Sequence, residues 1–183
     1  MSEIFGRLGT PGEPVASDGA PLALDAAGAR WLRRHQAAAV AALTTSTGGR
    51  FHAVAVSAFL QISTDPLLYL VSVESESRID VALSQSGFFA LNLLDRSQQF
   101  LADRLGGFAP AVPARFEGIP HFTAVTGAPI LTDSIGWIDC RIVDELTMGD
   151  HTNIVGEAVG LGRGTGDGDD PLVYYRNKYS PLR

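Results

Sequence analysis

The chain has 183 residues, of which 45% are apolar and 19% charged, a composition typical of a globular protein that can bury its own core. Its formal net charge of −6 argues against a nucleic-acid partner, because such a partner would need a basic surface. No apolar run approaches the ~20 residues of a membrane-spanning helix, so a membrane role is not expected.

Cysteine and histidine usage adds two limits. The single cysteine, Cys140, excludes an internal disulfide and is typical of the reducing cytoplasm, where we expect the protein to work. The four histidines are scattered without the spacing of metal ligands, so we predict no metal site. The first seven residues, MSEIFGR, lack the apolar segment of a secretory signal.

The chain opens with a stretch rich in glycine and proline. Residues 1–22 are therefore predicted to form an N-terminal arm, followed by a single domain at 23–183. Asp25 is placed to cap a helix that runs through Arg34.

Three strand patterns follow this helix. Residues 37–47 and 51–59 are rich in β-forming residues, and Gly48-Gly49 between them predicts a hairpin turn. The run Pro66–Val73 is short, bounded and almost entirely apolar, which favours a buried central strand over a helix.

Two short helices flank the next strand. Ser77 is placed to cap a helix over 78–86, which Gly87 ends, and 88–94 reads as a strand. The first helix would face the core with Ile79, Ala82 and Leu83. A second helix over 97–105 would do so with Phe100, Leu101 and Leu105.

The C-terminal half reads as β-structure between loops. Residues 106–120 are predicted as a surface excursion, 135–146 and 152–161 as partner strands, 162–170 as a mobile loop, and 171–179 as a closing segment. Alternation along the first of these strands puts Ile138, Cys140 and Ile142 on one face, with Asp139 and Arg141 on the other. Cys140 is therefore interpreted as a core residue and not as a nucleophile.

Strands dominate this order, and the helices are few and short. Strands joined by irregular connections, without regular crossover helices, predict a mainly β fold, an antiparallel barrel of six or seven strands that is closed or partly open. The sequence lacks the GxGxxG turn of a dinucleotide-binding domain, the P-loop lysine and the GxSxG elbow.

Three stretches in chain order carry a resemblance to one known family. They are residues 54–66, residues 75–78 with 86–94, and residues 149–157 with 171–176. The first is similar to a strand-loop-strand that wraps a flavin, the second to a phosphate-side loop, a helix and a strand, and the third to a Gly-Asp-His hairpin and a closing segment. Together they resemble the flavin reductase family of FMN-binding split barrels.

This resemblance implies a Greek-key-like split barrel with a few peripheral helices. It also implies an NAD(P)H-dependent flavin oxidoreductase that passes hydride to FMN or FAD and supplies reduced flavin to a partner flavin-dependent monooxygenase. Members of the family are homodimers with flavin sites near the subunit interface, so a homodimer is expected here as well.

His151 is the candidate catalytic residue. Gly149 and Asp150 form a two-residue connection in which glycine at the first position suits a type II′ turn, so His151 would begin a strand at the barrel rim. The resemblance implies that it lies near the flavin ring and the nicotinamide, where an imidazole can hydrogen-bond the cofactor or assist proton transfer. The alternative is a solvated rim histidine without a function.

Ser75, Ser77 and Arg78 are the candidate phosphate-side residues. A helix N-terminus offers free N–H groups and a positive dipole end, and Arg78 could add a bidentate contact to a phosphate. The alternative is a plain N-cap beside a surface arginine, and the carboxylates of Glu74 and Glu76 count against an anion here.

The resemblance places the flavin ring and its ribityl chain along the first stretch, where small side chains let backbone N–H groups approach a flat ring. The remaining candidate flavin-binding residues are Val56, Ser57, Ala58, Gln61, Ser63 and, as a ring that could stack, Tyr179. The sequence departs from the family pattern at four positions. Alanines replace Gly, Thr and Ser at Ala53, Ala55 and Ala58, and Gln61 stands where Ser is usual. These departures keep a second interpretation open, a flavin-binding module without reductase activity.

Overall fold

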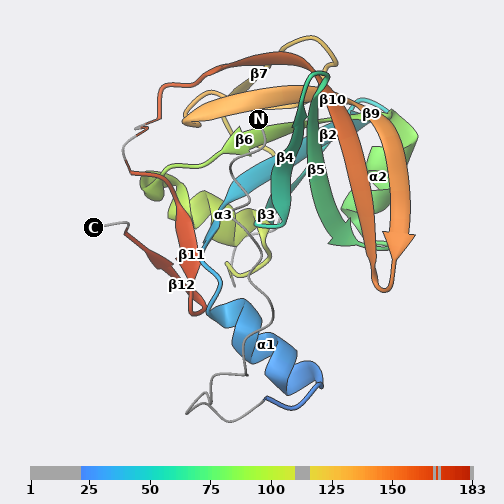
Figure 1. Ribbon diagram of the computed structural model, residues 1–183. Helices are drawn as coiled ribbons and strands as arrows, with labels where there is room; N and C mark the ends of the chain where they lie inside the picture. The colour runs from blue at the N-terminus through green and yellow to red at the C-terminus, as the bar shows by residue number, and fades with distance from the viewer. Residues whose placement is uncertain (1–21, 110–115, 167, 169, 182–183) are drawn as a thin grey trace, which may run out of the picture. The chain divides into compact units, whose positions relative to one another are not determined.

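The computed structural model describes residues 22–109, 116–166, 168 and 170–181 (Figure 1). The chain divides into two compact units, residues 1–33 and 34–183, which are described separately. In the first, Asp25 Oδ1 accepts the N–H groups of Ala27 and Gly28 and so caps α1 (Ala26–Arg34), as predicted. Apart from Leu22, the predicted arm 1–22 lies outside the described residues, and its boundary stays a prediction.

The second unit is built on one seven-stranded antiparallel sheet, whose spatial order is β3-β2-β6-β9-β10-β5-β4. This arrangement confirms the predicted mainly β, antiparallel architecture. The strands are β2 (Ala41–Thr47), β3 (Arg50–Val56), β4 (Phe59–Thr64), β5 (Leu67–Glu74), β6 (Phe88–Leu93), β9 (Gly136–Met148) and β10 (His151–Arg163).

Smaller elements border this sheet. One sheet joins β1 (Ala38–Ala39), β11 (Val173–Tyr175) and β12 (Lys178–Ser180), and a two-stranded ribbon joins β7 (His121–Thr123) and β8 (Pro129–Leu131). The helices are α2 (Arg78–Ser86), a 3₁₀ turn η1 (Arg96–Gln98) and α3 (Gln99–Leu105). No helix in the described ranges is long and apolar enough to cross a membrane.

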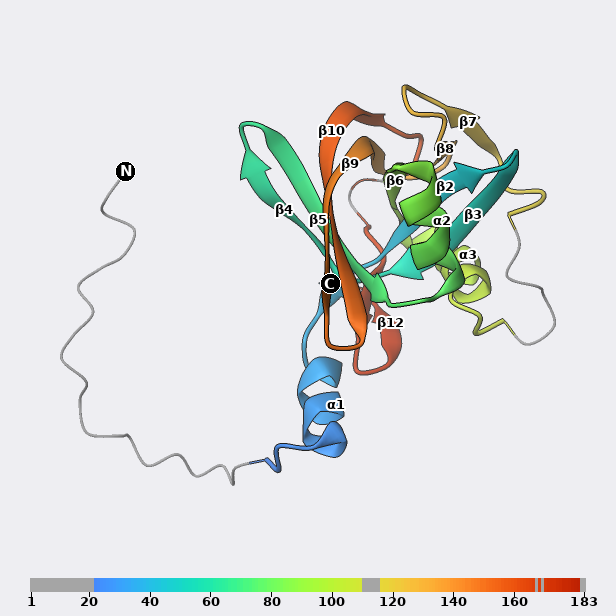
Figure 2. The same cartoon turned by 90° about the vertical axis from the view of Figure 1, so that its right-hand side faces the viewer.

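Strand alternation forms the main core, because every second side chain of the sheet faces inward. The inward set comes from β2, β3, β5, β6, β9 and β10, and α2 packs against it (Figure 2). As predicted, α2 contributes Ile79 and Leu83, and β9 contributes Ile138 and Cys140. Ser77 caps α2 and Gly87, with φ of +73°, ends it.

The opposite face of β2 and β3 is covered by a second cluster, to which α3, β8, β11 and the segment before β7 contribute. A third, smaller cluster with residues of β8 covers that face of β6 and β9. Asn92 on β6 links β2 to β8 on this side of the sheet, since its side chain donates to Ala42 O and accepts the N–H of Leu131. Asp139 lies on this face as expected but is fully buried, accepting the N–H groups of Val125 and Thr126.

Two predictions about this cover were wrong. Phe100 is 63% exposed, because it lies about 200° around α3 from the buried Ala102. The surface excursion 106–120 returns to the core, where Phe116 and Ile119 are buried; its residues 110–115 lie outside the described part.

The glycine-rich stretch 162–170 was predicted as a mobile loop but is packed closely where it is described. Gly162 and Arg163 extend β10, and Gly164 N–H donates to Ile135 O. A Cβ on Gly164 would collide with Ser134 O, so glycine here permits a close backbone approach. The segment predicted as one strand over 51–59 is also divided, because β3 ends at Val56 and β4 begins at Phe59.

Candidate functional site

The β9–β10 hairpin presents His151 as predicted. Gly149 has φ of +63° while Asp150 stays out of the positive region, which fits the type II′ turn, and His151 pairs with Met148 across it. The imidazole Nδ1 lies 2.7 Å from Asp150 Oδ1. The hydrogen bond from His151 lowers the pKa of Asp150, so this carboxylate is ionised at neutral pH and can only accept.

The tautomer of His151 follows from this contact. Because the carboxylate has no proton to give, Nδ1 carries one and points it at Asp150. In the described part of the chain Nε2 bonds to no protein group, and the side chain is 47% exposed. The hairpin therefore offers an oriented Nε2 to a ligand.

The loop before α2 is held by its own first turn. Asp80 N–H donates to Ser77 Oγ at 3.3 Å, and Asp80 Oδ2 accepts the N–H of Glu76 at 2.8 Å. Glu76 has φ of +63°, the left-handed conformation. Arg78, the first residue of the helix, is exposed, as are Glu74 and Glu76.

Ser75 joins this loop to the histidine hairpin. Its N–H donates to Asp150 O at 3.0 Å, and its hydroxyl lies 3.0 Å from the hydroxyl oxygen of Thr152. In the β5–β10 ladder Glu74 pairs with His151 itself. The structure thus brings the predicted phosphate-side residues and the predicted catalytic histidine together.

The third predicted segment lies at the start of the edge strand. Ser57 and Ala58 are exposed between β3 and β4, outside either strand, and Ala58 O accepts the N–H of Ser72 on β5. The Val56 side chain is in the core, which leaves only its backbone for a ligand. Gln61 and Ser63 lie further along β4.

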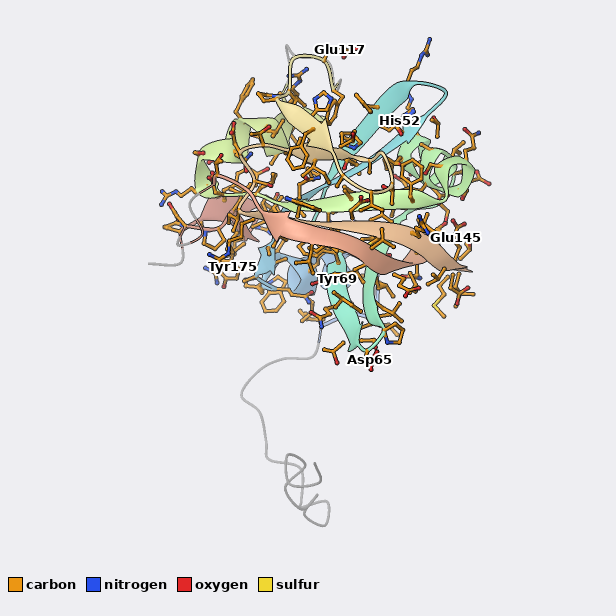
Figure 3. All side chains as sticks on the ribbon, turned by 90° about the horizontal axis from the view of Figure 1, so that it is seen from above. His52, Asp65, Tyr69, Glu117, Glu145 and Tyr175 are labelled. Atoms are coloured by element: carbon orange, nitrogen blue, oxygen red, sulfur yellow. The ribbon has the colours of Figure 1, made fainter. Side chains whose placement is uncertain are left out.

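Gln61 is oriented by neighbours that the sequence pattern did not indicate. The hydroxyl of Tyr69, labelled in Figure 3, donates to Gln61 Oε1, and Gln61 Nε2 donates to Ser63 O, both at 3.3 Å. The family departures at Ala53 and Ala55 fall elsewhere, because both side chains pack against the second cluster. Only Ala58 and Gln61 among the four departures remain beside the predicted site.

Tyr179 is placed apart from the other candidates. It lies on β12, which Figure 1 shows on the far side of the unit from the β9–β10 turn. Its hydroxyl donates to Asp103 Oδ1 at 3.1 Å, and its ring packs edge-to-face on Tyr174. Burial, followed by the bond to Asp103, raises the pKa of Tyr179. Its role in flavin binding stays a prediction.

These residues suit a flavin in three respects. Small side chains and backbone N–H groups outside the sheet ladder at Ser57 and Ala58 can meet a flat ring. The exposed guanidinium of Arg78 can meet a phosphate, and Nε2 of His151, which pairs with Glu74 across the β5–β10 ladder, is available to a ligand. The carboxylates of Glu74 and Glu76 oppose an anion, so Arg78 would carry most of the phosphate contact.

A cysteine nucleophile and a metal ion are two other ways in which the chain could perform chemistry. Burial, and then the charge of Asp139, raises the pKa of Cys140 to about 12, so its thiol is neutral and the predicted core role is confirmed. Among the described residues no three His, Cys, Asp or Glu side chains are arranged to hold a metal ion.

Sequence reasoning missed Asp80, Asp150 and Thr152. Asp80 had a signal, because Ser77-Arg-Ile-Asp80 has the spacing of a capping box. Thr152 and Asp150 O become partners of Ser75 only through the pairing of β5 with β10, which no local pattern specifies.

Comparison with known proteins shows the family to which the chain belongs. Residues 32–183 match the model of the flavin reductase like domain. The chain is 32% identical over 142 residues to the FMN reductase (NADH) RutF of Ancylobacter novellus, covering 78% of this chain and 77% of that protein. It is 32% identical over 143 residues to HsaB of Rhodococcus jostii, a flavin-dependent monooxygenase reductase subunit, covering 78% and 71%.

Among solved structures, the flavin reductase PheA2 in its native state superposes with a TM-score of 0.79 at 27% identity. The match covers 87% of this chain and 99% of PheA2. The chain belongs to the flavin reductase like domain family.

Proposed function

We propose that the protein is an NAD(P)H:flavin oxidoreductase that reduces FMN or FAD. A bound flavin accepts a hydride from the reduced nicotinamide ring, and with one proton from solution this gives reduced flavin and oxidised nucleotide. The observation that carries the proposal is the junction of Ser75 with the His151 hairpin, within a chain of this family. The name of the relative RutF supports FMN and NADH as the pair to test first.

The residues of the site divide the work of binding and of catalysis. Backbone N–H groups at Ser57 and Ala58 bind the flavin ring, and Arg78 binds the phosphate. His151, with Nδ1 held by Asp150, uses Nε2 to orient the nicotinamide or to pass the proton. The hairpin that carries this imidazole pairs with β5 as well as within itself, so the side chain is held by the sheet and not by a flexible loop.

The reduced flavin then leaves for a partner flavin-dependent monooxygenase. The relative HsaB, a reductase subunit of such a system, supports this step. That the protein works in the cytoplasm stays a prediction.

A homodimer is the assembly we propose, on the evidence of one sheet face. Leu60, Leu70 and Val155 pair side by side across β4, β5 and β10, with their side chains opposite to the core-facing set. Leu60 is 53% exposed, and Leu70 and Val155 are partly exposed. A second copy that covered this apolar row would stabilise both partners.

His151→Ala tests the catalytic assignment. We expect it to slow NADH-dependent bleaching of FMN on the order of 100-fold, because a misoriented donor loses the near-attack geometry. Flavin affinity and thermal stability should change little. His52→Ala is the matched control, since His52 bonds Thr47 on the β2–β3 hairpin.

Two results would count against these assignments. A His151→Ala protein that bleaches FMN at the wild-type rate removes His151 from the site. A wild-type protein that binds FMN but never bleaches with NADH or NADPH favours the alternative flavin-binding module.

A further inference from the structure

The carboxylate of Asp80 touches both halves of the site. Its Oδ2 accepts the N–H of Glu76 in the loop before α2 and the hydroxyl of Thr152 on β10, at 2.8 and 3.3 Å. Thr152 follows His151 directly in the chain and is buried. Asp80 therefore links the phosphate-side loop to the residue next to the histidine.

The flanks of His151 are held by the same segment. On one side Asp150 O accepts the N–H of Ser75, and on the other Thr152 contacts both the Ser75 hydroxyl and Asp80. Both neighbours of His151 are thus bonded to residues 75–80, Asp150 through its backbone carbonyl and Thr152 through its side-chain hydroxyl. A shift of that loop would be transmitted to the histidine through two separate connections.

The two carboxylate oxygens of Asp80 differ in their contacts, and helix capping alone does not account for the position of this side chain. Oδ1 is buried and has no hydrogen-bond partner among the described residues, whereas Oδ2 makes both links. A buried carboxylate oxygen without a partner costs stability. An N-terminal cap is already supplied by Ser77, so a role beyond the helix is indicated.

We propose that Asp80 is a positioning residue for His151. It locks the loop Glu74–Ser77 and the start of β10 into one body, so that a phosphate group bound beside this loop and the imidazole keep a fixed relation. The inference rests on the proposed flavin reductase function, but the lock itself exists in the protein without flavin.

The first test is amide hydrogen exchange in the flavin-free protein, which needs no activity. In Asp80→Ala the Ser75 N–H should exchange about fivefold faster, because the junction with Asp150 O loses its support. Amides of β2 and β6 should be unchanged. Asp144→Ala is the matched control, since Asp144 is an exposed residue of β9 whose carboxylate accepts the N–H of the next residue, Glu145.

The second test is the single-turnover rate of FMN bleaching by NADH. Asp80→Ala should slow it on the order of tenfold, and Asp80→Asn should restore most of the rate, since the amide oxygen can accept both links. In a His151→Ala background Asp80→Ala should add no further loss, because Asp80 acts through the histidine. Thr152→Val, which removes the link from the other strand, should behave like Asp80→Ala if the latter folds poorly.

The outcomes separate the two levels of the argument. Unchanged exchange at Ser75 in Asp80→Ala, or a rate loss that adds fully to that of His151→Ala, overturns the positioning role. A wild-type protein that does not reduce FMN overturns the proposed function while the exchange result still decides whether the lock exists.

Discussion

At the hairpin, an imidazole takes its orientation from the residue that precedes it. Asp150 is almost fully exposed, yet its contact with Nδ1 assigns the tautomer of His151 and leaves Nε2 for a ligand. In the predicted phosphate loop, Arg78 is the one positively charged residue, and its charged neighbours Glu74, Glu76 and Asp80 are all acidic. Arg78 is therefore the residue of this loop that attracts an anion. The two residues therefore make separable predictions, one for the rate and one for the affinity.

Replacing Arg78 by Ala should weaken FMN binding by roughly 1–3 kcal/mol, because a charge-assisted bond to the phosphate is lost. Riboflavin, which has no phosphate, should bind both proteins equally. Fluorescence titration of each flavin measures this, and Arg163→Ala on β10 provides an exposed arginine control. Equal FMN affinities in wild type and Arg78→Ala would assign Arg78 to the solvated surface.

At the level of elements, local signals in the sequence were enough where one residue type decides the backbone. Gly48-Gly49 and Gly149 gave two hairpin turns, and Ser77 with Gly87 gave both ends of α2. The burial of Asp139 and Phe116 could not be predicted this way. It depends on which segments cover the outer face of the sheet, and that is decided by pairing between strands far apart in sequence.

The same division holds for the candidate site. His151 and Ser77 follow from turn and capping patterns, whereas the Ser75–Thr152–Asp80 contacts exist only because β5 pairs with β10. The bond of Tyr179 to Asp103 likewise follows from no local pattern, because the two residues are far apart in the sequence.

Gly156 gives a prediction for the β9–β10 pair. A Cβ there would lie 2.5 Å from Phe89 Cε1 and 2.8 Å from Cys140 Cβ, both in fully buried side chains. Gly156→Ala should therefore lower the free energy of unfolding by roughly 1–3 kcal/mol through overpacking, as measured by urea denaturation. Gly160→Ala on the same strand, with its nearest contact at 3.3 Å, should cost less. A Gly156→Ala protein as stable as wild type would show that Phe89 and Cys140 can shift to accommodate the added methyl group.

For the whole molecule, the sheet has one face that the second unit leaves open. Buried clusters cover the outward side of β2, β3, β6 and β9, while Leu60, Leu70 and Val155 on β4, β5 and β10 keep solvent contact. The strand Pro66–Val73 was expected to be buried and central. It lies next to the edge strand β4. Its apolar run includes outward-facing residues such as Leu70, which pairs with Leu60 in the partly exposed apolar row.

Val155→Glu should therefore disrupt the proposed homodimer, because it places a charge within this apolar row, beside Leu70. Sedimentation velocity at micromolar concentration should show a dimer for wild type and a monomer for the variant. Phe100→Glu, which changes an exposed apolar residue on α3, should leave the dimer intact. A wild-type monomer at that concentration would contradict the assembly.

The central claim is that this chain transfers hydride from a nicotinamide nucleotide to a flavin. Anaerobic stopped-flow mixing of the wild-type protein and FMN with NADH, repeated with NADPH, tests it most directly. We predict loss of the oxidised flavin absorbance together with equimolar oxidation of the nucleotide, and a slower loss when the transferred hydrogen of the nucleotide is deuterium. Flavin that binds the protein but stays oxidised with both nucleotides would contradict the claim.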